Sequence, residues 1–257
     1  MRNILEEIQE KLSEIEKKEN VTILLAVESG SRAWGFASPD SDYDVRFIYV
    51  RKPKDYLKLK ELKDVIEWQL DHVLDINGWD LKKALVQFHR GNATLFEWSN
   101  SPIVYKKTAL WEEIYEKAKA YFSKKAAVYH YYGTAQSTFQ GYLQEEQVRY
   151  KKYFYALRPL LACRYVEEYG TAPPVLFEDL LGLALPDDLR RGIEELLEIK
   201  KKTDERERKP QIPVIIEFIR EEIKCQKQIA DAMEDDRRIE WDTLDRIYRE
   251  QILCDMA

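Results

Sequence analysis

The chain has 257 residues, which is enough for one large domain or two domains of ordinary size. Apolar residues make up 45% and charged residues 34%, so the composition is typical of a folded globular protein and excludes a disordered chain. The net charge of −6 argues against indiscriminate binding to nucleic acid, although it is compatible with a local basic groove.

No apolar run reaches the length needed to cross a bilayer, so we expect no membrane partner. The three cysteines are widely spaced and match neither a zinc pattern nor a disulfide framework. Because buried thiols of this kind suit a reducing compartment, we expect the protein to be cytoplasmic.

The first part of the chain mixes helical and strand patterns. Apolar residues three and four positions apart predict an amphipathic helix over residues 2–18. A continuous apolar run predicts a buried strand over 21–27, and strict alternation predicts a second strand over 43–50. Further short strands are expected within 64–76, followed by a helix that begins near Trp79.

From about residue 110 onward the pattern is helical and rich in charge. Pro159 is expected to start or kink a helix, because its ring blocks an ordinary helix interior. Residues 186–209 predict a solvated helix and loop. We therefore expect a mixed α/β domain over 1–108 and an α-helical domain over 109–257.

The most informative motif joins GSRAWG at 30–35 to SDYD at 41–44. In an extended strand, Asp42 and Asp44 lie on the same face and Tyr43 points to the other. Two neighbouring carboxylates repel each other unless a cation lies between them. A pair of divalent ions chelated by the phosphates of a nucleotide would supply that charge, so the motif indicates metal-assisted chemistry on a nucleoside triphosphate.

A nucleotidyl-transfer site also needs a third carboxylate on a neighbouring strand. Asp75 is the first choice, because a carboxylate among apolar strand residues needs a partner. Asp71 precedes that strand pattern and is compatible with a turn. Asp80 is the last choice, since a carboxylate at a helix N-terminus is explained by the helix dipole.

Two arginines near the motif have alternative interpretations. Arg32 is a candidate for contact with phosphate and equally for capping its own loop. Arg46 shares the carboxylate face of the second strand, and we expect it to pair with Asp44 in a structural role.

Two segments are locally basic. Residues 51–63 carry six basic and two acidic side chains, and we interpret them as a solvated loop or short helix. Residues 149–164 interleave five basic side chains with aromatics and hold no acid, which favours contact with nucleic acid. Within that run, Lys152 and Arg158 are candidates for nucleotide binding or for side chains that extend along a helix surface.

These residues resemble a known family. GSRAWG followed by SDYDV closely resembles the nucleotidyltransferase superfamily with the DNA polymerase β-type fold. The segments LDINGWDLKKAL, LFEWSNSPIVY and KKYFYALRPLLACRY resemble a narrower group, the predicted bacterial and phage RNA-repair-pathway polymerase-β-like nucleotidyltransferases. The resemblance covers roughly residues 20–180.

The resemblance implies an α/β (α+β) catalytic core with a mixed sheet, followed by an α-helical domain that closes over the nucleotide. It implies a metal-dependent transferase in which Gly30 and Ser31 contact the triphosphate. Asp42, Asp44 and Asp75 would bind Mg²⁺ or Mn²⁺. The association with RNA repair implies the pathway in which the protein acts, but it does not identify the substrate that accepts the nucleotide.

We expect an acceptor hydroxyl to attack the α-phosphate of a nucleoside triphosphate such as ATP and to release pyrophosphate. The 3′ end of an RNA is the favoured acceptor, and nucleotidyl tagging of a protein or a small molecule is the alternative. A non-catalytic nucleotide-binding module is a third possibility, which the intact Asp42 and Asp44 disfavour. The sequence leaves the oligomeric state open.

Overall fold

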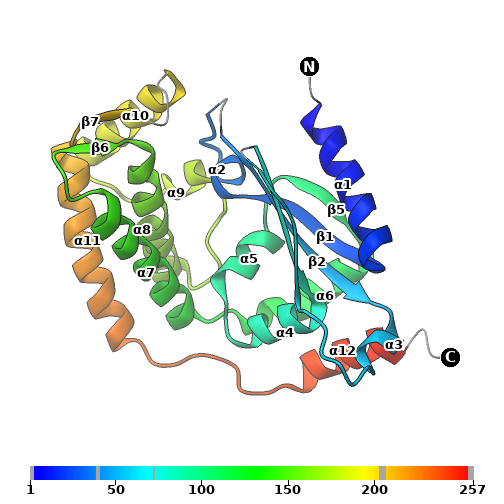
Figure 1. Cartoon of the computed structure of the whole chain (residues 1–257). Helices are drawn as coiled ribbons and strands as arrows, with labels where there is room; N and C mark the ends of the chain where they lie inside the picture. The colour runs from blue at the N-terminus through cyan, green and yellow to red at the C-terminus, as the bar shows by residue number, and fades with distance from the viewer. Residues whose placement is uncertain (1–2, 39–40, 72, 203–206, 254–257) are drawn as a thin grey trace. The chain divides into compact units, whose positions relative to one another are not determined.

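The computed structural model of the chain describes residues 3–38, 41–71, 73–202 and 207–253 (Figure 1). The chain folds into two compact units, and each unit collects separate stretches of sequence. The first unit consists of Met1–Ala33, Asp42–Tyr121 and Arg238–Ala257, and the second consists of Trp34–Ser41 and Phe122–Arg237. These units do not coincide with the ranges 1–108 and 109–257, and the assignment of those ranges as domains stays a prediction.

A five-stranded mixed sheet is the frame of the first unit, with the strand order β3-β4-β2-β1-β5. β2 and β4 pair in parallel, while the other neighbouring strands are antiparallel. The mixed sheet confirms the expected α/β class. The strands are β1 (Val21–Ser29), β2 (Tyr43–Arg51), β3 (Val65–Leu70), β4 (Leu74–Asp80) and β5 (Val104–Lys107).

One face of this sheet is covered by the N-terminal helix α1 (Ile4–Glu19) (Figure 1). Its apolar stripe of Ile8, Leu12 and Ile15 belongs to the same buried cluster as alternate residues of β2. Each such side chain contributes about 1.5–3 kcal/mol when it is fully buried, so the strand alternation fixes which face of β2 meets the helix. The opposite face, which carries Asp44 and Arg46, is thereby left for other contacts.

Shorter helices belong to the rest of the first unit. Phe88 and Phe96 are buried with their rings 5.1 Å apart, and Trp111 is also fully buried. The C-terminal helix contacts α4 in this unit, although it lies far from α4 in sequence. The helices are α2 (Gly30–Ala33), α3 (Pro53–Tyr56), α4 (Leu81–His89), α5 (Ala93–Ser99), α6 (Ala109–Ala118), the 3₁₀ turn η1 (Lys119–Tyr121) and α12 (Asp242–Leu253).

The expected helix start near Trp79 is wrong by two residues. Strand β4 continues to Asp80, whose side chain accepts a hydrogen bond from the amide of Lys82 and caps α4. β4 stays paired with β2 as far as Asp80, and within this pairing Gly78 lies directly opposite Phe47. A Cβ atom on Gly78 would lie 2.1 Å from the Phe47 ring.

The second unit is built mainly from helices, as the charged helical pattern predicts. α7 (Lys124–Tyr142) packs against α8 (Lys151–Tyr169), and α11 (Pro213–Ala232) contacts both. The helix predicted within 186–209 is α10 (Asp187–Lys202), and residues 203–206 of the predicted loop lie outside the described residues. A short strand that the sequence pattern did not predict follows them. The remaining elements are α9 (Phe177–Leu180), β6 (Gln147–Arg149) and β7 (Arg208–Pro210). Within the described ranges, no helix is long and apolar enough to cross a membrane.

Helix α8 does not start at Pro159. It begins at Lys151 and runs through the proline, which is buried in the helix interior. Tyr153, Phe154 and Leu157 are fully buried along the same helix. The basic and aromatic run that suggested a nucleic-acid surface is therefore largely the core of the second unit.

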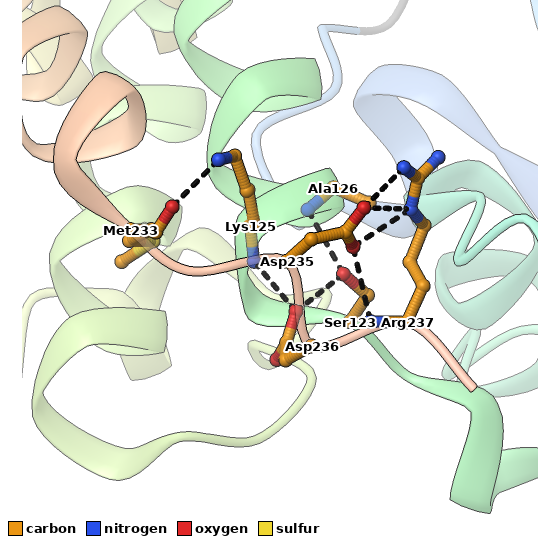
Figure 2. A network of polar contacts seen from close by, with 7 residues as sticks. All are labelled: Ser123, Lys125, Ala126, Met233, Asp235, Asp236 and Arg237. Carbon is orange, nitrogen blue, oxygen red and sulfur yellow. Dashed lines mark hydrogen bonds and ion pairs between the residues drawn. The ribbon is translucent and has the colours of Figure 1, made fainter. Parts of the chain in front are cut away.

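A polar network joins the start of α7 to the segment that follows α11 (Figure 2). The Ser123 hydroxyl caps α7 by accepting from the amide of Ala126, and it donates to Asp236 at 2.6 Å. Asp236 also accepts from the amides of Lys124 and Lys125. Burial favours the neutral acid, but these hydrogen bonds outweigh it and lower the pKa of Asp236.

We predict that Gly78→Ala destabilises the first unit by about 1–3 kcal/mol, because the new methyl group must displace the buried Phe47 ring. Chemical denaturation measures the change. Gly133→Ala is the matched control, since a Cβ atom on Gly133 meets nothing within 4 Å and alanine favours a helix. Equal stability of the Gly78→Ala variant and the native chain would show that this close approach is not a constraint.

We predict that Asp236→Ala destabilises the second unit by about 1–2 kcal/mol at neutral pH, because a helix cap and two amides lose their acceptor. The folded state lowers the pKa of Asp236, so its contribution is present above the ordinary aspartate pKa and is lost as the pH falls through the lowered value. Thermal unfolding of the native protein and of Asp236→Ala measures the effect at each pH. The difference in melting temperature between the two proteins should be smaller in acid than at neutral pH. Asp235→Ala is the control. If it lowers stability as much as Asp236→Ala does, the stabilising role assigned to Asp236 is wrong.

Candidate active site

The first part of the site is a helical turn where the sequence suggested a loop. α2 follows β1 directly, and Gly30 has a positive φ of 63°. A Cβ atom on Gly30 would lie 2.3 Å from a carboxylate oxygen of Asp44. Glycine is therefore required here on two grounds, the backbone conformation and the close approach of Asp44. Ser31 is buried in the same turn.

The second part is a pair of carboxylates on neighbouring strands. Asp44 of β2 lies directly opposite Asp75 of β4 in the parallel register. The guanidinium of Arg46 donates to Asp44 at 3.2 Å and to Asp75 at 2.7 Å. It also donates to the backbone oxygen of Asp75 at 3.1 Å. The expected pairing of Arg46 with Asp44 is confirmed, and Asp75 is a second partner.

The other two candidates for the third carboxylate have structural partners of their own. Asp71 accepts from the amides of Val73 and Leu74, both at 2.8 Å, and so closes the turn between β3 and β4. Asp80 caps α4 and accepts from the Tyr56 hydroxyl at 2.8 Å. Of the three candidates, Asp75 is thus the one that the sheet places beside Asp44.

Asp42 is exposed and immediately precedes β2. Arg32 donates to the backbone oxygen of Asp42 at 3.0 Å, and its guanidinium lies 3.7 Å from the centre of the Tyr43 ring. These contacts match the interpretation of Arg32 as a residue that caps its loop. Its predicted contact with phosphate stays a prediction.

The sequence interpretation missed Glu28, a carboxylate at the end of β1. It is only 1% exposed, and it accepts hydrogen bonds from the amide of Asp44 at 2.7 Å and from the Tyr105 hydroxyl. Burial raises the pKa of Glu28, while those two hydrogen bonds oppose the rise. The sequence did contain a signal for this residue. Glu28 directly follows an apolar strand pattern, and an acid buried in such a strand needs polar partners.

Burial also raises the pKa of Asp44, and the nearby charges of Asp75 and Asp42 raise it further against the opposing effect of Arg46. The three aspartates therefore repel one another, and the positive charge of Arg46 offsets the repulsion. Carboxylate oxygens are the ligands that Mg²⁺ prefers, so the chemistry of this set fits a divalent cation. Within the described residues, however, no group of three or more His, Cys, Asp or Glu side chains is arranged to hold a metal ion.

Lys152 and Arg158 belong to the second unit. Arg158 is 2% exposed, donates to the backbone oxygen of Val175 at 3.2 Å and lies 4.7 Å from the Trp34 ring centre. Such burial argues for a structural role. The Lys152 ammonium lies 3.8 Å from the Tyr142 ring centre in a cation–π contact. The predicted roles of both residues in nucleotide binding stay predictions.

Comparison with known proteins agrees with the resemblance drawn from the motifs. The "Uncharacterized protein YcgL" of Bacillus subtilis (strain 168) is 42% identical to this chain over 242 residues, which cover 93% of each protein. A nucleotidyltransferase-like protein from Exiguobacterium sibiricum 255-15 aligns with 97% of this chain and 87% of its own, at 13% identity and a TM-score of 0.31. The model of the RNA repair pathway DNA polymerase beta family, RlaP, matches residues 4–250. With nearly its whole length matched, the chain belongs to the RNA repair pathway DNA polymerase beta family.

Proposed function

We propose that the protein is a metal-dependent nucleotidyltransferase that moves a nucleoside monophosphate from a nucleoside triphosphate to an acceptor hydroxyl, with release of pyrophosphate. The observation that carries the proposal is the placement of Asp44 opposite Asp75, beside the bare backbone of Gly30. Membership of the RNA repair pathway DNA polymerase beta family supports it.

The proposed ligands of Mg²⁺ or Mn²⁺ are Asp42, Asp44 and Asp75. When bound, the metal would lower the pKa of the acceptor hydroxyl and neutralise charge on the leaving pyrophosphate. Glu28 has a positioning role, because its hydrogen bond to the amide of Asp44 fixes the backbone that carries this carboxylate. Gly30 leaves the space into which the Asp44 carboxylate fits.

Arg46 gives the site a cation of its own. Its guanidinium contacts both Asp44 and Asp75 and is itself held by the backbone oxygens of Val45 and Asp75. We propose that this contact keeps the two carboxylates side by side before substrate binds. Without it, two partly buried carboxylates on adjacent strands would repel each other.

We propose an RNA 3′ end as the acceptor and ATP or another nucleoside triphosphate as the donor, in the cytoplasm. The family's association with RNA repair is now the main support for RNA. The basic run at 149–164 supports it less than its sequence suggests, because two of its four aromatic side chains, Tyr153 and Phe154, are buried in α8 together with Arg158. Tagging of a protein or a small molecule stays the alternative acceptor chemistry.

We predict that Asp44→Asn and Asp75→Asn each lower nucleotidyl transfer by about 100-fold or more, because each removes a charge that stabilises the transition state. The assay combines the protein, Mg²⁺ and α-labelled nucleoside triphosphates with RNA that ends in a 3′-hydroxyl. RNA blocked by a 3′-phosphate and a cell lysate are separate arms that report the acceptor.

Asp71→Asn is the matched control, since Asp71 contacts backbone amides in a turn. If Asp71→Asn abolishes transfer and Asp75→Asn does not, the assignment of the third carboxylate is wrong. If the native protein binds triphosphates but transfers label to no acceptor, the chain is a nucleotide-binding module.

We also predict that Gly30→Ala lowers transfer by about tenfold or more, because its methyl group occupies the position of the Asp44 carboxylate and a misplaced group loses rate steeply. Gly35→Ala carries the same backbone penalty at a positive φ of 83°, but its nearest neighbour is the Leu176 side chain. Both variants should lose stability, whereas the Gly30 variant alone should lose this much activity. An equal loss of transfer in the two variants would point to a general effect of strain.

A further inference from the structure

A cavity lies at the other end of the sheet from Asp44 and Asp75. It has a volume of about 680 Å³ and is enclosed by the segment after α3 and by one side of α4. Asp80 lines it and ends β4, five residues beyond Asp75, which is about 17 Å along an extended strand. The cavity belongs wholly to the first unit and is separate from the proposed catalytic carboxylates.

Three of the four acidic groups that line this cavity have polar partners of their own. Asp55 pairs with Lys58 at 2.6 Å, and Asp64 pairs with Lys83 at 3.0 Å. Asp80 is 4% exposed, and burial raises its pKa while the Tyr56 hydroxyl and the Lys82 amide bond to it. Glu61 is thus the one lining carboxylate, among the described residues, without such a partner.

The cations in the cavity are in excess. Four lining cations have no ion pair within the part of the chain that the structure describes, namely Lys60, Lys63, Lys82 and Arg90. Lys82 and Arg90 come from one side of α4, while Lys60 and Lys63 come from the facing segment. Cations from two walls therefore converge on one space, whereas the cations of a freely solvated loop point apart.

The cavity also has an apolar part. Val86 of α4 is half-buried in its wall, and Leu62 is 38% exposed on the facing segment. Tyr56 adds an aromatic side chain to the lining. A wall that combines apolar contact with several unpaired cations suits a ligand that carries both phosphate groups and a base or sugar.

We propose that this cavity binds the phosphate groups of a nucleotide ligand at a site distinct from Asp44 and Asp75. The ligand is either a stretch of RNA backbone or a free nucleotide, which share the same phosphate chemistry. Lysine and arginine bind phosphate oxygens through charge-assisted hydrogen bonds, and arginine does so with a two-pronged fork. The basic segment 51–63 thus gains a function beyond that of a solvated loop.

The test compares two triple variants of equal charge change. Lys60→Gln, Lys82→Gln and Arg90→Gln together remove three exposed cations of the cavity. Lys17→Gln, Lys117→Gln and Arg246→Gln remove three exposed cations elsewhere in the first unit and form the control. Circular dichroism checks that both variants are folded.

Binding is measured in EDTA by fluorescence anisotropy, with a labelled short single-stranded RNA, a labelled ATP and a labelled oligo-glutamate peptide as probes. We expect the cavity variant to lose about tenfold in affinity for RNA or for ATP, and the control variant to lose much less. For RNA, the slope of log affinity against log salt should fall by about 2, since each lost phosphate contact contributes about 0.7. If the cavity variant loses affinity for RNA alone, the cavity binds the RNA backbone. If it loses affinity for both RNA and ATP, the cavity binds a nucleotide.

Three results would overturn the proposal: unchanged binding of RNA and ATP by the cavity variant, equal losses in the two triple variants, and equal binding of oligo-glutamate and RNA. The outcome is independent of the catalytic proposal. Neither Asp44 nor Asp75 lines the cavity, and the binding measurement in EDTA involves no transfer, so failure of the catalytic proposal would leave the comparison of the two triple variants unchanged.

Discussion

The parallel pairing of β2 with β4 is the constraint on which the site depends. It sets Asp44 directly opposite Asp75 and places the Arg46 guanidinium within hydrogen-bonding distance of both carboxylates. A shift of the register by one residue would turn Asp75 to the other face of the sheet. That face is filled by α1 and its apolar stripe, so burial of the core holds the carboxylates in place.

Two further residues help to position the Asp44 carboxylate beside Asp75. Gly30 leaves room for the Asp44 carboxylate, and the buried Glu28 binds the amide of Asp44. Glu28 is anchored in turn by the Tyr105 hydroxyl from β5. The site thus draws on strands β1, β2, β4 and β5. Arg46 offsets part of the negative charge of the acids from within the sheet, and this reduces the repulsion between Asp44 and Asp75.

The local sequence pattern predicted strands β1 and β2 and the pairing of Arg46 with Asp44. Side chains alternate between the two faces of a strand, so the sequence decides which of them share a face. It failed where the outcome depends on residues distant in sequence. Trp79 belongs to a strand because it pairs with Ile48 of β2, and much of the 149–164 run is buried because other helices pack against α8. Nor could amphipathic patterning reveal that α12 packs on α4, since it gives the apolar face of a helix but not its partner.

We propose that Asp44 and Asp75, which both contact Arg46, also bind a divalent cation together with substrate. Titration with Mn²⁺ in the presence of a non-hydrolysable nucleoside triphosphate, followed by electron paramagnetic resonance, tests it most directly. We expect the native protein to bind Mn²⁺, and we expect Asp44→Asn and Asp75→Asn each to weaken this binding by about tenfold or more. Native affinity for Mn²⁺ in both variants would contradict it.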